Sequence, residues 1–217
     1  MNDRLLPLLK EEGLKKLNNA TVAVIGIGGV GGICVEALAR CGVGNIIVQD
    51  HDIVEESNIN RQIVANYTTI GKYKVDVIEN IIKNINPNCN VIKLNSFFDE
   101  NNNDLFNYKI DYVVDAIDSF DSKCLLISEC INRNINFISS MGAAKKLDPK
   151  LVNVIKINKT NTDPLAKKVR LRFKGYNFDV VSSSEISKCE MLGSYMPVVS
   201  TFGLLAANHV IINLIGE

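Results

Sequence analysis

Short apolar runs alternate along the first two thirds of the chain with longer segments whose apolar residues have helical spacing. The short runs at 21–25, 46–49, 89–94, 111–116 and 137–140 predict strands. The segments at 8–17, 34–41, 72–86 and 123–134 predict helices around and between them. This alternation is typical of a doubly wound, mostly parallel α/β sheet with crossover helices.

Beyond Gly142 the pattern changes. Residues 151–157 alternate weakly, which predicts an extension of the sheet, and residues 198–214 are apolar with small side chains, which predicts a packed C-terminal helix. The stretch between them, 159–190, is interpreted as a basic, mobile loop. We expect a single domain over residues 1–217, with a C-terminal sheet extension and helix.

Composition and charge exclude several classes of protein. Hydrophobic residues make up 47% and charged residues 22% of the chain, as in ordinary globular domains. The 24 basic residues cancel the 24 acidic ones, so any contact with nucleic acid must come from a local patch. We expect no membrane span, and the charged N-terminal stretch lacks a signal-peptide core, which favours the cytoplasm.

The six cysteines are at positions 34, 41, 89, 124, 130 and 189, and no two of them form a CxxC pair. Structural zinc sites and redox-active dithiols usually contain such pairs. We therefore expect no zinc and free, mostly buried thiols in a reducing compartment.

A glycine-rich turn joins the first strand to the following helix. In GIGGVG, Gly26 permits the tight turn, Gly28 lets the backbone approach a phosphate and Gly31 allows close packing of the helix. Asp50 ends the second strand, where a carboxylate can accept hydrogen bonds from ribose hydroxyls. The turn alone does not distinguish NAD, FAD and ATP, so a nucleotide-sensing or redox module of the NAD type stays open.

Polar residues downstream favour a polyphosphate. Arg61 can bind phosphate oxygens in a bidentate way, Asn58 can hold a ribose or phosphate oxygen, and Lys74 can add a point charge. Asp118 follows a buried strand, where its carboxylate can hold the Mg²⁺ of ATP. Asp115 is the alternative metal ligand.

Motifs in a fixed order connect these residues to a superfamily. GIGGVGG, NINRQ, TIGKYK, INPNC and DAIDS occur here as they do in ubiquitin-activating enzymes and in the bacterial adenylyltransferases of thiamine and molybdopterin biosynthesis, which this chain resembles. The resemblance implies an ATP site in a homodimer, with one arginine acting across the interface, which makes Arg61 a candidate for the partner's site. Arg4 matches an N-terminal arginine that reaches phosphates in that superfamily, although Lys10 stands where a glycine is usual. The implied ligands are Asp50 for the ribose, Asn58, Arg61 and Lys74 for the phosphates, and Asp118 for the metal.

Three further stretches indicate a branch of that superfamily. SSMGAAKKLDP, NKTNTDPLAKKVRLRFK and the Ser-Ser-Glu at 183–185 are similar to the tRNA threonylcarbamoyladenosine dehydratases. This resemblance implies ATP-dependent cyclisation of threonylcarbamoyladenosine next to the anticodon, through an adenylated carboxylate and with release of pyrophosphate and AMP. The region 185–193 is shorter than in some relatives.

The resemblance leaves two partners to identify. A basic cluster is the candidate tRNA contact, and it comprises Lys159, Lys167, Lys168, Arg170, Arg172 and Lys174. A sulfur-transfer protein is a possible second partner, but ring closure within the substrate needs no enzyme nucleophile, so Cys189 is not expected to be catalytic. The alternative function is activation of the C-terminus of a ubiquitin-like sulfur carrier by the same ATP site.

Overall fold

A single sheet forms the centre of the protein. The structure is a computed structural model that describes residues 2–187 and 189–216. Within these residues the strand order is β3-β2-β1-β4-β5-β7-β6, and all neighbours are parallel except β6, which runs antiparallel to β7. The predicted doubly wound, mostly parallel sheet is confirmed. The strands are β1 Thr21–Ile25, β2 Asn45–Gln49, β3 Asn90–Leu94, β4 Tyr112–Asp115, β5 Asn136–Ser140, β6 Val152–Lys156 and β7 Asp179–Ser183.

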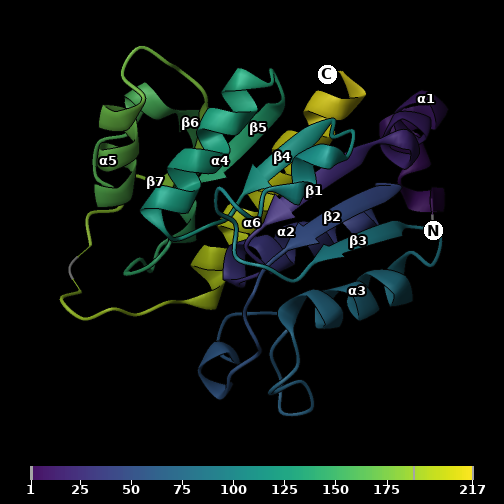
Figure 1. Cartoon of the computed structure of the whole chain (residues 1–217), viewed down its shortest axis with the longest axis horizontal. Coiled ribbons are helices and arrows are strands. Elements are labelled where there is room, and N and C mark those ends of the chain that lie inside the picture. Colours follow the sequence, from purple (N-terminus) through teal and green to yellow (C-terminus); the bar gives the residue numbers. More distant parts are fainter. Residues whose placement is uncertain (1, 188, 217) are drawn as a thin grey trace.

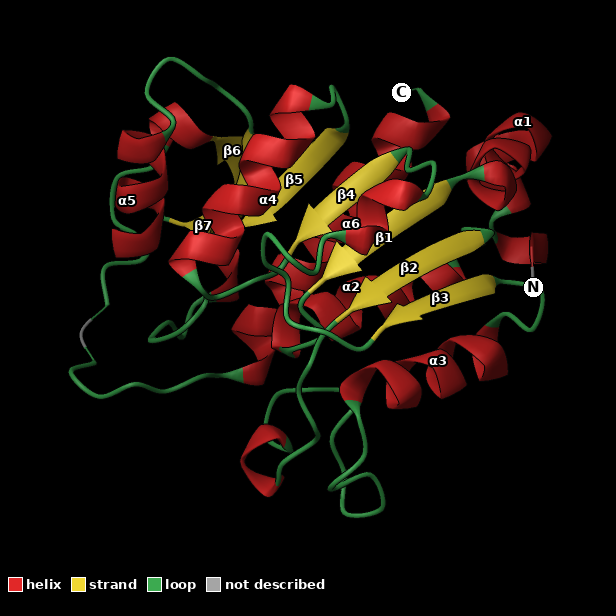
Figure 2. Cartoon of the chain, in the orientation of Figure 1, coloured by secondary structure: helices red, strands yellow, loops and turns green. Residues whose placement is uncertain are grey.

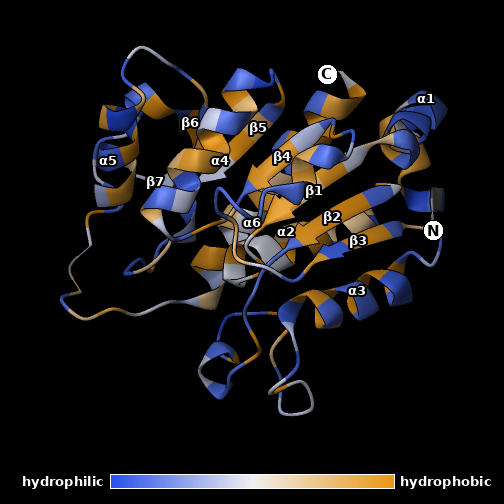
Figure 3. Ribbon diagram, in the orientation of Figure 1, coloured by the Kyte–Doolittle hydropathy of each residue, from blue (hydrophilic) through white to orange (hydrophobic). Residues whose placement is uncertain are grey.

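Helices cover both faces of this sheet (Figures 1 and 2). Buried side chains of α2, α3 and α6 pack on one face, whereas α4 packs on the other with α5 beside it. Figure 3 shows mostly apolar strands between helices in which apolar and polar residues alternate, as expected for a sheet buried on both faces. The helices are α1 Leu6–Asn19, α2 Gly29–Arg40, α3 Lys74–Ile85, α4 Phe120–Asn132, α5 Pro164–Arg172 and α6 Met196–Ile215.

The C-terminal helix α6 packs against α2. A Cβ on Gly203 would lie 2.1 Å from Ile33 Cγ2 and 2.3 Å from the Val30 carbonyl oxygen, so only glycine allows this contact. By length and composition α6 could cross a membrane, so the expectation of no membrane span stays a prediction. Half of its apolar window is buried inside the protein, including Phe202 and Val210, which accounts for its composition.

The segment 159–190 is not a loop, and this corrects the sequence interpretation. It contains helix α5 and strand β7. Asp163 caps α5 by accepting a hydrogen bond from the Ala166 N–H at 2.8 Å. Val180 and Val181 of β7 are fully buried and pair with the end of β5, so β7 joins the sheet extension β6 to the parallel core.

Candidate active site

A pocket of about 480 Å³ opens at the carboxyl ends of β1, β2, β4 and β5. Strands β1 and β4 are neighbours, but their following helices α2 and α4 lie on opposite faces of the sheet. This reversal leaves a crevice between the two connections, which is where ligands bind in open α/β sheets. Figure 1 shows these strand ends pointing to the same side of the molecule.

The glycine-rich turn forms one wall of this pocket. Gly26 has a φ of 90°, and a Cβ there would lie 2.6 Å from the Ala116 carbonyl oxygen. A Cβ on Gly31 would lie 1.8 Å from the Gly26 carbonyl oxygen, so the start of α2 requires glycine as well. At Gly28 a Cβ would meet only Gln62 Nε2, at 3.9 Å, and would project into the pocket. The turn therefore leaves free the space in which a phosphate would approach the N-terminus of α2.

Asp50 lies against this turn. Its Oδ2 accepts a hydrogen bond from the Ile27 N–H at 2.6 Å, and its Oδ1 accepts one from the Asp52 N–H at 2.8 Å. Both backbone donors fix the carboxylate at the pocket wall, beside the phosphate-binding turn. This is the position in which a carboxylate can hold the ribose of a bound nucleotide.

Asn58 and Arg61 reach the same pocket from the connection between β2 and α3. The buried Asn58 side chain accepts a hydrogen bond from the Glu55 N–H at 3.2 Å, which orders a short 3₁₀ turn. Arg61 Nη1 donates to the Ser57 carbonyl oxygen at 2.8 Å and to Asn60 Oδ1 at 2.9 Å. Arg61 lines the pocket of its own chain, which is the placement that a role in cis requires. That Arg61 serves a partner's site stays a prediction.

Lys74 is the first residue of α3 and lines the pocket next to Asp52. Its side chain is 6% exposed, and Nζ donates to Asp52 Oδ2 at 2.7 Å. Asp50, His51 and Asp52 offer ligand atoms within 4.8 Å of one another. Since backbone amides engage Asp50 and the Lys74 ammonium engages Asp52, we assign no metal to this cluster.

The two candidate metal ligands after β4 have different environments. Asp118 is exposed at the pocket wall, and the described residues provide no hydrogen bond or ion pair to its carboxylate. Asp115 is fully buried, and its Oδ2 lies 2.8 Å from Lys123 Nζ. Asp115 is therefore one half of a buried ion pair, which corrects its consideration as a metal ligand, whereas the Asp118 carboxylate suits a hard cation.

Several pocket residues were not identified from the sequence. The pocket is also lined by Gln49, Ser96 and Phe97, and by the segment 140–144 at the end of β5. The segment 140–144 lies within SSMGAAKKLDP, but the sequence pattern assigned no role to it. Gln49 ends β2 and Ser96 follows β3, and nothing in their spacing indicates that the two side chains are in contact. In the structure Gln49 Nε2 donates a hydrogen bond to Ser96 Oγ at 3.1 Å.

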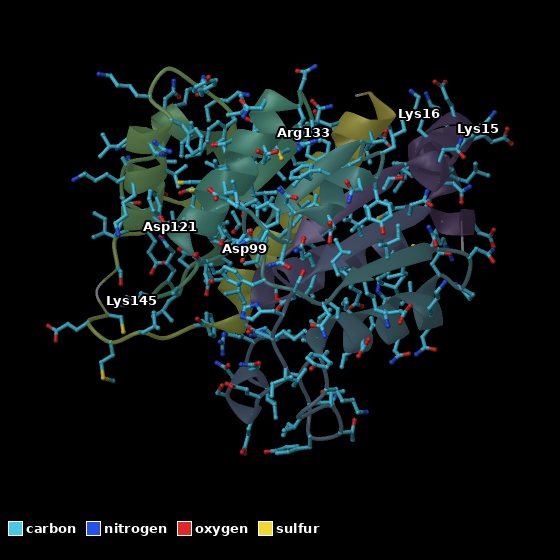
Figure 4. All side chains as sticks on the ribbon, in the orientation of Figure 1. Lys15, Lys16, Asp99, Asp121, Arg133 and Lys145 are labelled. Atoms are coloured by element: carbon cyan, nitrogen blue, oxygen red, sulfur yellow. The ribbon has the colours of Figure 1, made fainter. Side chains whose placement is uncertain are left out.

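Arg4 does not reach this pocket. It is exposed, ends a short 3₁₀ turn before α1, and is not among the residues that line the pocket. The end of the chain that carries this turn lies at the amino ends of the strands (Figure 1). Figure 4 shows Lys15 and Lys16 of α1 at the end of the molecule opposite Lys145. The helix kinks at Lys10, whose φ of 58° is in the left-handed region that favours glycine.

The basic cluster lies mainly on α5, close to the pocket. Leu165 of α5 lines the pocket, so this helix borders the site. Arg170 is hydrogen-bonded within the protein, since its Nη1 donates to Thr160 Oγ1 at 2.7 Å. The remaining members of the cluster are exposed, namely Lys159, Lys167, Lys168, Arg172 and Lys174.

The six cysteines are free thiols, as expected. Burial raises the pKa of Cys34 to about 12 and that of Cys89 to about 11, so both stay protonated at neutral pH. Cys189 is exposed and lines a second pocket of about 700 Å³ that adjoins the first at Ser194.

Proteins of known name resemble this chain over most of its length. It is 48% identical over 165 residues to the tRNA threonylcarbamoyladenosine dehydratase of Bacillus subtilis, which covers 76% of this chain and 65% of that protein. It is 39% identical over 179 residues to the enzyme of the same name from Escherichia coli, covering 82% of this chain and 66% of that protein. The matched part thus spans slightly less than two thirds of these relatives' length.

A solved structure and a family model agree with these similarities. The crystal structure of the E. coli dehydratase TcdA in complex with ATP superposes with a TM-score of 0.92 at 35% identity, covering 96% of this chain and 91% of that chain. The model of the ThiF family matches residues 2–217. The match includes both the glycine turn and the C-terminal sheet extension, and on this evidence the chain belongs to the ThiF family.

Proposed function

We propose that this protein is an ATP-dependent tRNA threonylcarbamoyladenosine dehydratase. The observation that carries the proposal is the pocket at the reversal of strand order, where the glycine turn, Asp50, Arg61, Lys74 and Asp118 converge. The similarity to an enzyme of that name solved with ATP supports the choice of nucleotide and substrate. An NAD-type module would need neither the arginine nor the lysine.

The pocket residues fit the parts of ATP in order. The carboxylate of Asp50 is placed for the ribose, and the N-terminus of α2 is placed for a phosphate behind the open Gly28. Arg61 and Lys74 add positively charged side chains to the lining of the pocket. These charges stabilise the negative charge that builds up on the phosphate oxygens during transfer.

Mg²⁺ fits the exposed carboxylate of Asp118. Hard cations prefer carboxylate and phosphate oxygens, and Asp118 offers oxygens that no described protein group engages. Bound there, Mg²⁺ would neutralise phosphate charge and orient the nucleotide. The structure contains no other acid on the pocket wall near β4 that is equally available, because Asp115 is paired with Lys123 within the described residues.

The chemistry needs two steps and no enzyme nucleophile. The carboxylate oxygen of the threonylcarbamoyl side chain attacks the α-phosphorus, and pyrophosphate leaves. The carbamoyl group of the same side chain then attacks the activated carbonyl carbon and releases a proton, and AMP leaves with the former carboxylate oxygen. The net change is loss of one water from the side chain, and the tethered attacking group makes covalent catalysis by Cys189 unnecessary.

The protein is further proposed to act as a cytoplasmic homodimer on tRNA. Four large apolar side chains, Ile53, Tyr67, Ile70 and Tyr73, are 42–79% exposed on the connection that carries Asn58 and Arg61. Such a group is more apolar than a solvated loop requires and suits a two-fold contact. The apolar residues of α6 give weaker support, since most of them are buried within the chain.

Dehydration itself provides the direct test. Incubation of the protein with Mg²⁺, ATP and tRNA carrying threonylcarbamoyladenosine is expected to convert the nucleoside to a form lighter by one water, detected by mass spectrometry of digested tRNA. ATP–pyrophosphate exchange should require the modified tRNA. Exchange that depended instead on a ubiquitin-like carrier protein would contradict the proposal.

The exposed residues of α5 are expected to bind tRNA phosphates. The triple variant Lys167→Ala/Lys168→Ala/Arg172→Ala should weaken tRNA binding by about tenfold or more and flatten its salt dependence, because fewer counterions are released. ATP affinity should not change. Lys15→Ala, at the opposite end of the molecule (Figure 4), is the matched control. An equal loss in the control, or no loss in the triple variant, would assign the tRNA contact elsewhere.

A further inference from the structure

Lys123 is fully buried and is among the largest side chains with no exposed surface in the described part of the protein. It lies in the first turn of α4, directly behind the wall that β4 and β5 contribute to the pocket. An ammonium group is strongly hydrated, and removing it from water is costly unless all of its donors are satisfied. Its burial beside the site therefore needs an explanation.

All three protons of this ammonium have acceptors. Lys123 Nζ lies 2.8 Å from Asp115 Oδ2, 3.3 Å from Ser139 Oγ and 2.9 Å from the Ser140 carbonyl oxygen. An ammonium has three donors, so the set is complete. These contacts tie α4 to the ends of both β4 and β5.

The partner carboxylate carries the connection to the pocket wall. Asp115 Oδ1 accepts a hydrogen bond from the Ile117 N–H at 3.0 Å, and Oδ2 accepts one from Ser139 Oγ at 2.5 Å. Ile117 and Ser140 both line the pocket, and Asp118 is the residue after Ile117. The buried pair thus holds the turn that presents the Asp118 carboxylate to the pocket.

Stability alone is a weak reason for such a pair. A buried ion pair can often be replaced by apolar residues of similar volume without loss of stability, because desolvation offsets the attraction between the charges. Fully satisfied networks, however, fix the geometry of the groups that they join. This network lies between two strand ends that both reach the pocket, which favours a role in fixing the positions of the pocket residues at those ends.

We propose that Lys123 is a positioning residue that, through Asp115 and Ser140, fixes the turn carrying Asp118 for Mg²⁺·ATP. This inference rests on the proposed function, in which Asp118 holds the metal. Lys123 is fully buried and acts only through its neighbours.

The test separates orientation from stability by replacing both charges. In Lys123→Met the unpaired Asp115 should lower Tm markedly, whereas Lys123→Met/Asp115→Leu should recover most of the loss. Binding of α,β-methylene-ATP is then measured by calorimetry with and without Mg²⁺. This analogue cannot transfer its adenylyl group to an acceptor. In the double variant the affinity without Mg²⁺ should stay close to that of the unmodified protein. The gain in affinity that Mg²⁺ confers should shrink by about tenfold or more.

Two control variants make the outcomes distinguishable. Asp118→Asn should abolish the Mg²⁺ gain at unchanged Tm, and Ile127→Val, a buried change on the same helix, should lower Tm slightly and leave the gain unchanged. If the unmodified protein shows no Mg²⁺ gain, or Asp118→Asn keeps it, the assignment of the metal to Asp118 fails. If both behave as expected but the double variant keeps the full gain, Lys123 is structural only and the inference is overturned.

A second pair of substitutions answers the same question if the first does not fold. Lys123→Met/Asp115→Asn keeps an acceptor for the Ile117 N–H and removes only the ammonium and its link to Ser140. We expect a loss of about threefold or more in the Mg²⁺ gain, since part of the network remains. An unchanged gain in this variant also overturns the inference.

Discussion

Asp118→Ala and Arg61→Ala are each expected to reduce ATP–pyrophosphate exchange by about a hundredfold or more while leaving the fold intact. Removing a preorganised charge from a developing phosphoryl transition state affects turnover far more than nucleotide affinity. Neither side chain contributes to the hydrophobic core, because Asp118 is exposed and Arg61 is bound only to polar groups of its own loop. The expected cost in unfolding free energy is about 1 kcal/mol or less.

Exchange rates at saturating ATP and modified tRNA, together with thermal unfolding, check this prediction. Arg133→Ala is the matched control, since Arg133 (labelled in Figure 4) is a partly exposed arginine that pairs with Glu129 on α4 and does not line the pocket. Exchange close to that of the unmodified protein in either site variant would show that the residue does not contact the reacting phosphates. A large fall in Tm would indicate a structural role instead.

Most of the fold could be predicted because its signals are local. The apolar runs of β1, β2 and β4 are buried on both faces, and the helical spacing in α3 produces one buried side of the helix. Strand β7 was missed because only Val180 and Val181 mark it between polar neighbours. Helix α5 was hidden by its basic residues, although Ala166, Val169 and Phe173 have the spacing of a buried helical face.

The site could be predicted in outline because its motifs follow strand ends that meet at one edge of the sheet. The pairings between side chains could not, because they depend on distances between segments far apart in the sequence. In the sequence Lys123 is an ordinary helix residue, and only the structure shows its contacts with Asp115 and the end of β5. Whether Arg61 serves its own pocket or a partner's also depends on three-dimensional placement, and within one chain Arg61 lines its own pocket.

Arg4 is the residue for which a second subunit matters most. It does not line the pocket of its own chain, so we expect it to contact nucleotide phosphates in a partner's site. If the homodimer places it there, Arg4→Ala should reduce exchange by about tenfold or more, as expected for loss of one charge-assisted phosphate contact. Sedimentation should show that the variant remains a dimer.

Mixed dimers distinguish an arginine that acts in trans from one that acts in cis. Heterodimers are obtained by co-expressing two differently tagged chains and purifying on both tags. When an Arg4→Ala chain pairs with an Asp118→Ala chain, one site combines the intact Asp118 of the first with the intact Arg4 of the second, and the other site has both defects. Such dimers should show about half of the unmodified activity, since one of two equivalent sites is complete.

The same experiment with Arg61 should give the opposite result. In a dimer of Arg61→Ala and Asp118→Ala chains each pocket has one defect, because both residues line the pocket of their own chain. Activity should therefore stay at the level of the two inactive parents. Restored activity in this pair would show that Arg61 crosses the interface after all, and no recovery with Arg4 would mean that the N-terminal arginine does not reach a partner's nucleotide.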